Sequence, residues 1–393
     1  MKFSCDVLVV GAGPAGLSAA SSAAKKGVRT LLIDKRTEIG DNNHCGELLP
    51  STVEIKDLLP RASEVEKLVE VPSRLIMART KILRLISPSG KGVEFPFESN
   101  IIDRRGFEKH LAIEASRHGA DIMPLTKATG GLGDGHSITA ISKGEKIEID
   151  SSVTIGCDGI GSRVASWSGL GNNMSPRDSI VGVQFEMSRV VVESDVVEMY
   201  FGADVAPGGY AWIIPKSDDV ANVGLGIRTA FSEKGVSVKE YLSRFLNFNK
   251  VAAEKVSRGT AVAFRKGVIP VGGPIAKTFN ENVIVAGDAG GFTMAANGGG
   301  MPPGLVTGKI AGEVAAEHLT KMVDLSQYEK EWQYQIGKEL RTALEIRRLI
   351  DKTMDSDEKM ESIMNRLGPK YMSELIRCRL PRILKIGAKI IRA

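Results

Sequence analysis

The sequence predicts an α/β protein that combines a nucleotide-binding domain, a second domain built on a mixed β-sheet, and a helical C-terminal region. An apolar strand, a glycine loop and an Ala/Ser-rich helix open the chain in the order of a parallel βαβ unit. Strand-like patterns with turn residues recur in 71–97 and in 181–227, which indicates a separate sheet. From Pro303 onward the pattern is helical.

The bulk composition is that of a folded protein larger than one average domain. Of the 393 residues, 42% are hydrophobic and 25% are charged, and the net charge is +5. The apolar stretch Phe3–Val10 is short and Asp6 interrupts it, so it is not expected to be a signal peptide. No apolar run reaches the ~18 residues of a membrane span. We therefore expect a protein of the cytoplasm or of a membrane surface, without a nucleic-acid partner.

The four cysteines give no sign of a metal centre or of a disulfide framework. They are widely scattered, and no pair has the spacing of a metal site. We therefore predict no metal. The cysteines are Cys5, Cys45, Cys157 and Cys378.

The first domain is predicted from segments that lie far apart in the chain. Asp6–Val10 is a buried strand because its apolar run is continuous, and Gly27 ends the helix Pro14–Lys26. The further predicted elements are the strands Thr30–Ile33, Ser152–Ile155 and Val283–Ala286 and the helix Phe107–Arg117.

The second domain is predicted from strand-like segments in the middle of the chain, namely Val71–Phe97, Val196–Phe201, Tyr210–Pro215 and Ala221–Ile227. We assign 1–70, 98–165 and 276–325 to the nucleotide-binding domain, 71–97 and 166–275 to the sheet domain, and 326–393 to the helical region.

The first glycine motif predicts a dinucleotide at the start of the first helix. Gly11 allows the tight turn, Gly13 lets the backbone approach a pyrophosphate, and Gly16 lets helix and strand pack closely. The phosphates are then expected at the helix N-terminus. Asp34, at the end of the second strand, would bind ribose hydroxyls and repel a 2′-phosphate, which favours FAD or NAD over NADP. We include its neighbour Lys35 among the cofactor contacts.

Two later motifs turn this prediction towards FAD. Asp288 follows a buried strand, where an aspartate would bind the ribityl chain of a flavin. The run Gly298–Gly304 can pass close to a flat ring, and its prolines favour a helix start that would stabilise a reduced flavin anion. Asp158, in the motif Gly156–Arg163, either contacts the cofactor or only braces its own loop. Arg104 either pairs with the pyrophosphate or lies at the surface. The three motifs together predict FAD.

Cys45 and His44 are candidates for chemistry. A thiol beside a histidine and Gly46 can be reactive, but such a cysteine is more often simply small and buried, and the histidine has the same two interpretations.

These motifs resemble those of p-hydroxybenzoate-hydroxylase-like flavoproteins, whose FAD-binding domain is of the glutathione-reductase type. Within them the chain is most similar to the geranylgeranyl reductase family, in particular the archaeal digeranylgeranylglycerophospholipid reductases. Three stretches of the chain carry the resemblance: His44–Glu47, Asp103–Leu111, and Ala206–Pro215 with its Tyr-x-Trp-x-x-Pro signature.

The resemblance implies an FAD-dependent enzyme that reduces isolated C=C bonds of geranylgeranyl chains by hydride transfer from flavin N5. It implies that Tyr210 and Trp212, on the strand that ends at Pro215, line an apolar channel for the prenyl chain. Without the family, the aromatic pair would more often be plain core. The candidate proton sources are Cys45, His44, Tyr210 and water. The FAD contacts that it implies are Ala15, Asp34, Cys45, Gly46, Leu48, Arg104, Ala128, Asp288, Gly300 and Met301.

Other flavoprotein functions stay open. The run Glu47–Pro50 and the Tyr210–Pro215 strand also resemble flavin-dependent halogenases, for which Lys81 is the candidate catalytic lysine. A halogenase or monooxygenase acting on a small aromatic compound is therefore an alternative, as is a flavoprotein without catalysis. Ala295 stands where the family often has proline.

The partners are predicted from what the chain lacks and from its basic end. No second strand–glycine motif–helix unit is present, because Gly130–Gly135 lacks the flanking elements, so electrons would come from NAD(P)H docking transiently or from a ferredoxin-like carrier. Lys370–Arg392 mixes apolar and basic residues around Pro381. It predicts either an interfacial helix on anionic lipid or a basic helix packed on the protein. We expect an isoprenoid lipid substrate and a peripheral location on the inner face of the cell membrane.

Overall fold

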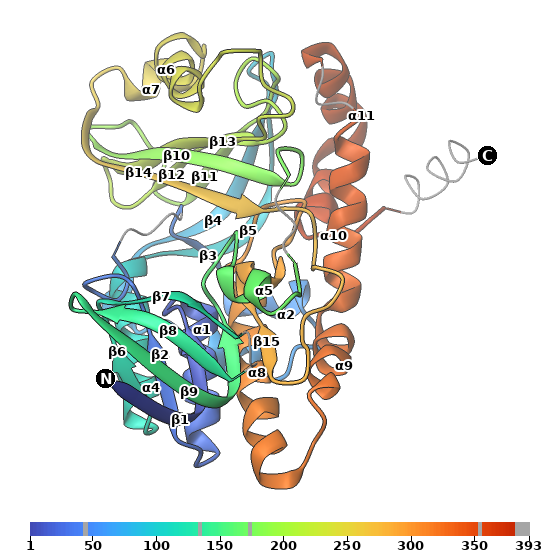
Figure 1. The fold of residues 1–393 in the computed structure, drawn as a ribbon. Helices are drawn as coiled ribbons and strands as arrows, with labels where there is room; N and C mark the ends of the chain where they lie inside the picture. Colours follow the sequence, from blue (N-terminus) through green and yellow to red (C-terminus); the bar gives the residue numbers. More distant parts are fainter. Residues whose placement is uncertain (42–45, 133–135, 172–174, 353–355, 382–393) are drawn as a thin grey trace.

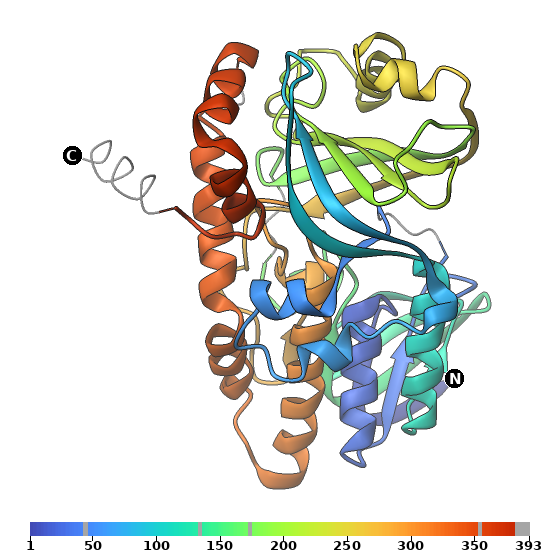
Figure 2. The same ribbon diagram turned by 180° about the vertical axis from the view of Figure 1, so that it is seen from behind.

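The computed structural model describes residues 1–41, 46–132, 136–171, 175–352 and 356–381. Two lobes, each built on one sheet, lie one above the other in Figure 1, and long C-terminal helices run along one side of both. Figure 2 shows the β4–β5 hairpin extending from the upper lobe down to the lower one. The predicted α/β fold with two sheets and a helical C-terminal region is confirmed.

The lower lobe holds a seven-stranded sheet in the order β6-β2-β1-β9-β8-β7, with β15 paired to β9. In the parallel part of the sheet, Val10 lies beside both Ile33 and Gly156, and Gly156 lies beside Val285. The carboxyl ends of these strands therefore meet at one edge, which brings three distant glycine motifs together. The strands are β1 (Lys2–Val10), β2 (Thr30–Ile33), β6 (Asp121–Met123), β7 (Thr126–Gly131), β8 (Ser137–Ser142), β9 (Glu145–Gly156) and β15 (Val283–Val285).

Small residues let two helices pack closely beside this sheet. A Cβ on Gly308 or Gly312 of α8 would stand 2.1 or 2.2 Å from a carbonyl oxygen of α1. Helix α4 begins earlier than predicted, at Arg104, because the Asp103 side chain caps it by accepting a 3.0 Å hydrogen bond from the Gly106 N–H. The helices are α1 (Pro14–Lys25), α4 (Arg104–Arg117) and α8 (Met301–Lys321).

The upper lobe holds an eight-stranded mixed sheet in the order β14-β10-β13-β12-β11-β4-β5-β3. Helix α6 (Val238–Phe248) packs on one face through Tyr241 and Phe245, and α7 (Ala252–Val256) packs beside it through its own buried residues, whereas the other face turns towards the lower lobe. The strands are β3 (Leu48–Pro50), β4 (Ile76–Ile86), β5 (Gly92–Ile102), β10 (Ser179–Ser188), β11 (Val196–Tyr200), β12 (Tyr210–Pro215), β13 (Val220–Ile227) and β14 (Thr260–Pro270). Strand β14 was not predicted from the sequence, because its residues do not alternate between apolar and polar: Ala261–Phe264 are all apolar, and Arg265–Gly267 interrupt the run.

The C-terminal region consists of α9 (Ser326–Gln335), α10 (Gly337–Ile350) and α11 (Asp357–Ile376). Helix α11 is kinked at Gly368, just before Pro369. Its last turn is packed on the protein, as one of the two alternatives for the basic C-terminal segment predicted, whereas 382–393 lie outside the described residues. Within the described ranges, no helix combines the length and the apolar character that a membrane crossing requires.

Candidate active site

A cavity of about 420 Å³ lies between the two lobes. Its lower wall comes from the carboxyl edge of the first sheet and from the N-termini of α1 and α8. Its upper wall comes from β4, β5, β10, β12 and β14 of the second sheet. The cavity is therefore the place where the glycine motifs and the aromatic strand of the sequence analysis meet.

The first glycine motif forms a backbone cradle on the lower wall. A Cβ on Gly16 would stand 1.8 Å from the Gly11 carbonyl oxygen, so the strand and the helix touch there. Gly13 lines the cavity, and a Cβ on it would meet no atom within 4 Å. The backbone at Gly13 is therefore accessible to a ligand, whereas Gly16 lies where strand and helix pack against each other.

Two helix N-termini open into this cradle. The N-cap residues are Gly13 for α1 and Gly300 for α8, and neither supplies a side-chain cap. Both residues line the cavity, as do Ala15 and Met301. Pro14 begins α1, and Pro302 and Pro303 follow Met301 in α8, so the N–H groups left at the two starts are those of Ala15 and Gly16 in α1 and of Met301 in α8. With the favourable end of each helix dipole, these groups attract a phosphate or a developing negative charge. The pair suits a ligand with a pyrophosphate at one end and an anionic ring at the other.

Asp34 ends β2, and its carboxylate is held by the backbone and by Arg36. It accepts hydrogen bonds from the Ala12 N–H at 2.6 Å and from Arg36 Nε at 2.9 Å. Burial by itself favours the protonated acid, but the hydrogen bonds and positive charge of Arg36 outweigh it, so the pKa of Asp34 lies below its usual value. Arg36 lines the cavity and also contacts Glu108. The sequence analysis missed Arg36, which belongs to no motif.

Asp288 lies in the short helical turn after β15 and is half-buried at the cavity. Its carboxylate accepts a 3.3 Å hydrogen bond from Thr293 Oγ1. Burial raises the pKa of this carboxyl, and the Thr293 hydrogen bond and the charge of Arg104 oppose that rise only in part. Arg104 lines the cavity and pairs with Glu108 at 2.7 Å. A desolvated carboxylate of this kind would be stabilised by ligand hydroxyl groups, so the lower wall fits FAD.

Three predicted cofactor contacts lie away from this cradle. The carboxylate of Asp158 accepts hydrogen bonds from the Arg163 and Val164 N–H groups at 2.8 and 3.2 Å, so it caps the short helix α5 (Arg163–Trp167) and braces its loop. Ala128 lies on β7, and Lys35 is exposed. None of the three lines the cavity.

Tyr210 and Trp212 point from β12 into the cavity, with their ring centroids 5.9 Å apart. The Tyr210 hydroxyl donates a 2.6 Å hydrogen bond to the Asn297 carbonyl oxygen, and Trp212 Nε1 donates a 3.2 Å bond to Gln184 Oε1. The indole lies across Gly224 of the neighbouring strand, where a Cβ would stand 2.8 Å from the ring. Both aromatic rings are therefore fixed wall elements. Pro215, at the end of the strand, is buried and does not line the cavity.

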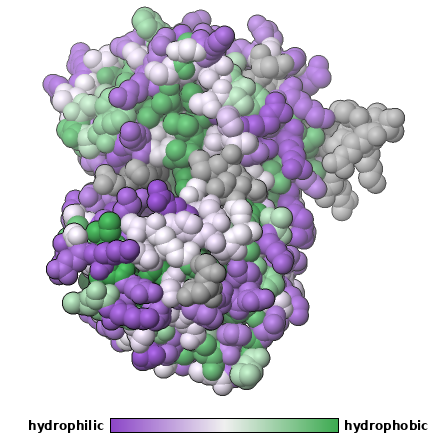
Figure 3. All heavy atoms as spheres, viewed as in Figure 1, coloured by the Kyte–Doolittle hydropathy of each residue, from purple (hydrophilic) through white to green (hydrophobic). Residues whose placement is uncertain are grey.

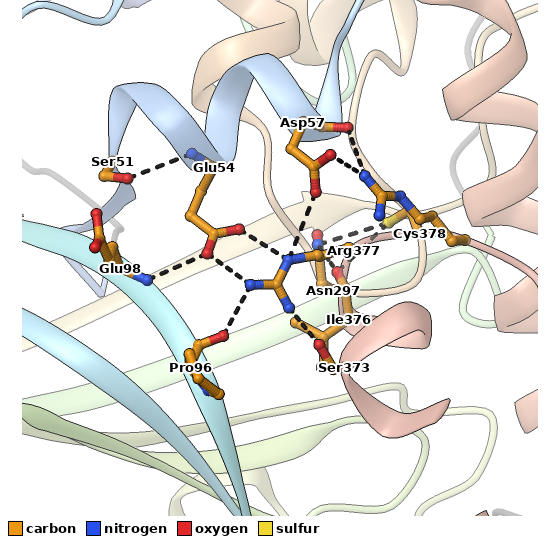
Figure 4. Close-up of polar contacts among 11 residues, drawn as sticks. Ser51, Glu54, Asp57, Pro96, Glu98, Asn297, Ser373, Ile376, Arg377 and Cys378 are labelled. Carbon is orange, nitrogen blue, oxygen red and sulfur yellow. Dashed lines mark hydrogen bonds and ion pairs between the residues drawn. The ribbon is translucent and has the colours of Figure 1, made fainter. Parts of the chain in front are cut away.

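The end of α11 closes part of the apolar wall. Ile376 lines the cavity, and the Asn297 side chain donates a 3.0 Å hydrogen bond to its carbonyl oxygen. The next residue, Arg377, binds both carboxylate oxygens of Glu54 at 2.6 and 2.9 Å. Figure 4 shows these contacts joining α11 to α2 (Thr52–Leu58), to β5 and to the loop before α8. Sequence analysis missed this junction because its residues are far apart in the chain.

A buried charge cluster holds the turn before β3. Glu47, at φ 66°, accepts hydrogen bonds or ion pairs from Lys216 at 2.7 Å and from Arg265 at 2.9 Å. The Asn222 side chain donates to the Gly46 carbonyl oxygen at 3.1 Å and to Glu47 at 2.9 Å. Gly46, Leu48 and Arg265 line the cavity. His44 and Cys45 precede this turn and lie outside the described residues.

Lys81, the lysine considered for the halogenase alternative, is exposed on β4 and does not line the cavity.

Two family models match the chain. The geranylgeranyl reductase catalytic domain matches residues 178–269, which include Tyr210, Trp212 and Arg265. The FAD dependent oxidoreductase model matches residues 6–187, which include the glycine cradle and Asp34.

Curated relatives are similar over almost the whole chain. A digeranylgeranylglycerophospholipid reductase of Methanocaldococcus jannaschii is 36% identical over 92% of this chain and 90% of its own length. A protein named digeranylgeranylglycerophospholipid reductase 1, from Methanothermobacter thermautotrophicus, is also 36% identical, over 98% of both chains.

Solved structures share the fold. A geranylgeranyl bacteriochlorophyll reductase-like protein from Thermoplasma acidophilum superposes with a TM-score of 0.85 and 25% identity, over 99% of this chain and 100% of its own. A flavin-dependent brominase variant reaches a TM-score of 0.75 at 16% identity, over 99% and 98% of the two chains, which shows a shared fold and nothing further.

Proposed function

This chain belongs to the geranylgeranyl reductase family, and we propose that it reduces isolated C=C bonds in the geranylgeranyl chains of a membrane-lipid precursor. It is an FAD-dependent oxidoreductase acting on CH–CH groups. The observation that carries the proposal is one cavity with a bare backbone cradle on one wall and fixed apolar side chains on the other. Such a cavity can hold a flavin and a hydrocarbon chain face to face.

Reduced FAD, when bound, supplies a hydride from its N5 atom to one carbon of the double bond, and a proton adds to the other carbon. The cavity residues that would hold FAD are Gly13, Ala15, Arg104, Asp288, Gly300 and Met301, around the two uncapped helix starts. Asp34 does not line the cavity itself, and its carboxylate lies beside the glycine loop, where it accepts a hydrogen bond from the Ala12 N–H. Asp34 would bind the ribose and Asp288 the polyol chain.

The protein must supply most of the remaining catalysis by orientation, because an isolated alkene has no carbonyl group to polarise. Trp212 and Tyr210 are held by hydrogen bonds to Gln184 and Asn297, so they form a rigid wall for an isoprenoid chain. The apolar side chains around them exclude water from the reacting carbons.

We propose Cys45 as the proton source. The turn at Glu47, two residues after Cys45 in the chain, is fixed by contacts with Lys216, Arg265 and Asn222. The Tyr210 hydroxyl already donates its proton to the Asn297 carbonyl oxygen, which favours a positioning role for it. His44 is the second candidate.

The electrons for the next turnover are proposed to come from NAD(P)H or from a ferredoxin-like carrier. The glycine cradle at the start of α1 is the strand–glycine motif–helix unit described here, and because it binds FAD it is not available to a nicotinamide cofactor. We propose a cytoplasmic protein that works at the inner face of the cell membrane, where a prenylated lipid is found.

The proposal is tested anaerobically with purified FAD-loaded protein. Dithionite reduces the flavin, a geranylgeranylated glycerophospholipid is added, and the lipid is weighed by mass spectrometry. We expect the lipid to gain the mass of two hydrogen atoms for each reduced double bond. Asp288→Ala is expected to abolish this gain through loss of FAD, which absorbance reports.

Unchanged lipid with FAD-loaded protein would contradict the proposal. The same assay in air, with NADH and a small aromatic substrate, then tests the halogenase or monooxygenase alternative.

A further inference from the structure

The outer side of β14 exposes apolar side chains in a row. Val262, Phe264 and Val268 are 61, 41 and 37% exposed, and the exposed Lys266 lies between the last two. We call these four residues the β14 face. Alternate residues of a strand share one side, so Phe264, Lys266 and Val268 form one row. Val262 adjoins the end of this row, at a β-bulge where the pairing with β10 shifts register. Figure 3 shows hydrophobic side chains gathered on this side of the upper lobe.

The β14 face is left open by the way the upper lobe packs. β14 is the edge strand of its sheet, and β10 is its neighbour. Helix α6 covers β10 and β13 through Tyr241, Leu242 and Phe245, and it leaves the edge strand β14 outside this packing. Phe264 contacts Phe185 of β10 at a ring-centroid distance of 5.2 Å and still keeps its outer surface exposed. A patch of several large apolar side chains on the surface commonly marks a site of contact.

Basic residues lie on and near the β14 face. Lys239 Nζ lies 5.6 Å from the centre of the Phe264 ring, and Lys266 belongs to the face itself. Lys250 and Arg258, in the same part of the chain, are exposed, whereas Lys255 and Arg265 are held in ion pairs with Glu198 and Glu47. Apolar side chains flanked by lysine and arginine match a bilayer that carries phosphate groups.

The β14 face is continuous with the cavity. Lys266 and Val268 belong to both, and Ile269, the next residue, also lines the cavity. A hydrocarbon chain that leaves a bilayer at Val268 would therefore meet the cavity rim directly. The opposite side of β14 carries Arg265, which belongs to the Glu47 cluster on the upper wall.

We propose that the β14 face is the surface by which the protein docks on an anionic lipid bilayer, and that the isoprenoid substrate enters the cavity past Val268. The entry route rests on the proposed function, whereas the docking does not. A protein partner that adds a strand to the sheet would bind the backbone of the edge strand, and an acidic electron carrier would bind the lysines without needing the apolar side chains. The apolar side chains and the lysines together favour the bilayer.

The test is co-sedimentation of the FAD-loaded full chain with vesicles of phosphatidylglycerol and phosphatidylcholine. We expect Val262→Asp and Phe264→Asp to weaken vesicle binding by at least about tenfold, because each places a carboxylate in an apolar, anionic contact. Ile113→Asp, on the half-exposed surface of α4, is the matched control and should bind as the wild type does. Val262→Asp is the safer variant, since Val262 is the most exposed residue of the face.

The activity assay separates docking from chemistry. With vesicle-embedded lipid, both variants should lose activity in proportion to binding, and with detergent-dispersed lipid Val262→Asp should match the wild type. Failure of the wild type to bind vesicles overturns the proposal, and so does binding of both variants as strong as that of the wild type. The proposal is also overturned if light scattering shows that the wild type is a dimer and that Val262→Asp is a monomer, because the β14 face is then an interface between two copies of the chain. Vesicle binding without any lipid reduction would overturn the proposed function and leave the docking surface standing.

Discussion

The two walls of the cavity are built in different ways. The lower wall is mostly backbone, formed by Gly13, the bare starts of α1 and α8, and one desolvated carboxylate at Asp288. The upper wall is mostly side chains, with Trp212 held by Gln184 and with Ile376 brought in from the far end of the chain. A backbone wall recognises groups that every FAD molecule carries, whereas a side-chain wall can be changed one residue at a time.

This difference separates two kinds of sensitivity to mutation. Substitutions on the lower wall should affect cofactor binding and the fold together. Those on the upper wall should alter the substrate reaction while FAD stays bound. Four predictions, made on five variants, test this separation in order of expected effect.

The largest effect is expected from Gly16→Ala. The new Cβ would stand 1.8 Å from the Gly11 carbonyl oxygen, and backbone on both sides leaves little room to move. We expect unfolding free energy to fall by about 3 kcal/mol or more, together with loss of FAD. Thermal unfolding and flavin absorbance check this. A variant that melts like the wild type and keeps its FAD would show that β1 and α1 separate more easily than the structure implies.

Glu54→Gln is expected to come next. It removes the charge that Arg377 binds with two hydrogen bonds, in a site where both side chains are nearly buried. The guanidinium keeps the Pro96 carbonyl oxygen at 2.8 Å and the Asp57 carboxylate at 3.7 Å, so losing the Glu54 charge should cost about 2 kcal/mol and loosen the end of α11, with FAD retained. Urea unfolding measures the loss. The control is Glu64→Gln, which breaks the exposed pair with Lys67 and should cost about 0.5 kcal/mol or less. If the two variants lose the same unfolding free energy, the Glu54–Arg377 contact does not stabilise the upper wall.

A pair of variants should separate the two walls directly. Gly13→Ala adds a Cβ that meets no protein atom within 4 Å, so FAD affinity should fall about tenfold while the apoprotein melts normally. Trp212→Leu should instead keep FAD and lower kcat/KM for the lipid by about tenfold. Flavin titration and steady-state kinetics distinguish them. Gly130→Ala, another position with open space for a Cβ, is the control for the first variant. Loss of FAD in Trp212→Leu would contradict the division of roles.

The smallest effect is expected from Asp288→Asn in the apoprotein. The pKa of Asp288 is raised in the folded protein, so folding favours its protonated form. Stability from this group is therefore greatest in acid and falls as pH rises from the ordinary carboxyl pKa through the raised one. Asparagine does not titrate, so the variant lacks this loss of stability with rising pH. The variant apoprotein should be slightly more stable than the wild type at neutral pH and equal to it in acid, and it should bind FAD more weakly. Unfolding curves across this pH range provide the measurement, and a variant that is less stable at neutral pH would contradict the assignment.

Much of the lower wall could be predicted from short stretches of sequence. The strand, glycine loop and helix around Gly13 are neighbours in the chain, and so are Asp288 and the start of α8. Each stretch determines its own turn and leaves its own backbone bare. Asp158 marks the limit of this approach, because its motif is present while its carboxylate caps α5.

The upper wall could be predicted only in part. The family resemblance implied that Tyr210 and Trp212 line one channel, whereas their alternation along the strand would by itself have favoured plain core, and the structure brings both to the cavity. The partners that fix the wall were missed. Asn297 joins Tyr210 to the end of α11, and Glu54 lies 323 positions from Arg377. No local pattern can indicate such contacts, because they depend on how the two lobes and the last helix pack.

The sequence by itself determined the family, the cofactor and the local shape of each glycine turn. These depend on the conformations that a few consecutive residues can adopt, together with a signature on one strand. Only the tertiary structure decided which side chains meet across the cavity, that Glu47 is surrounded by cations, and that β14 leaves an apolar face open at the cavity rim. The physical reason is that contacts between distant segments arise from the pairing order of two sheets and from the packing of α11, which the chain fixes only as a whole.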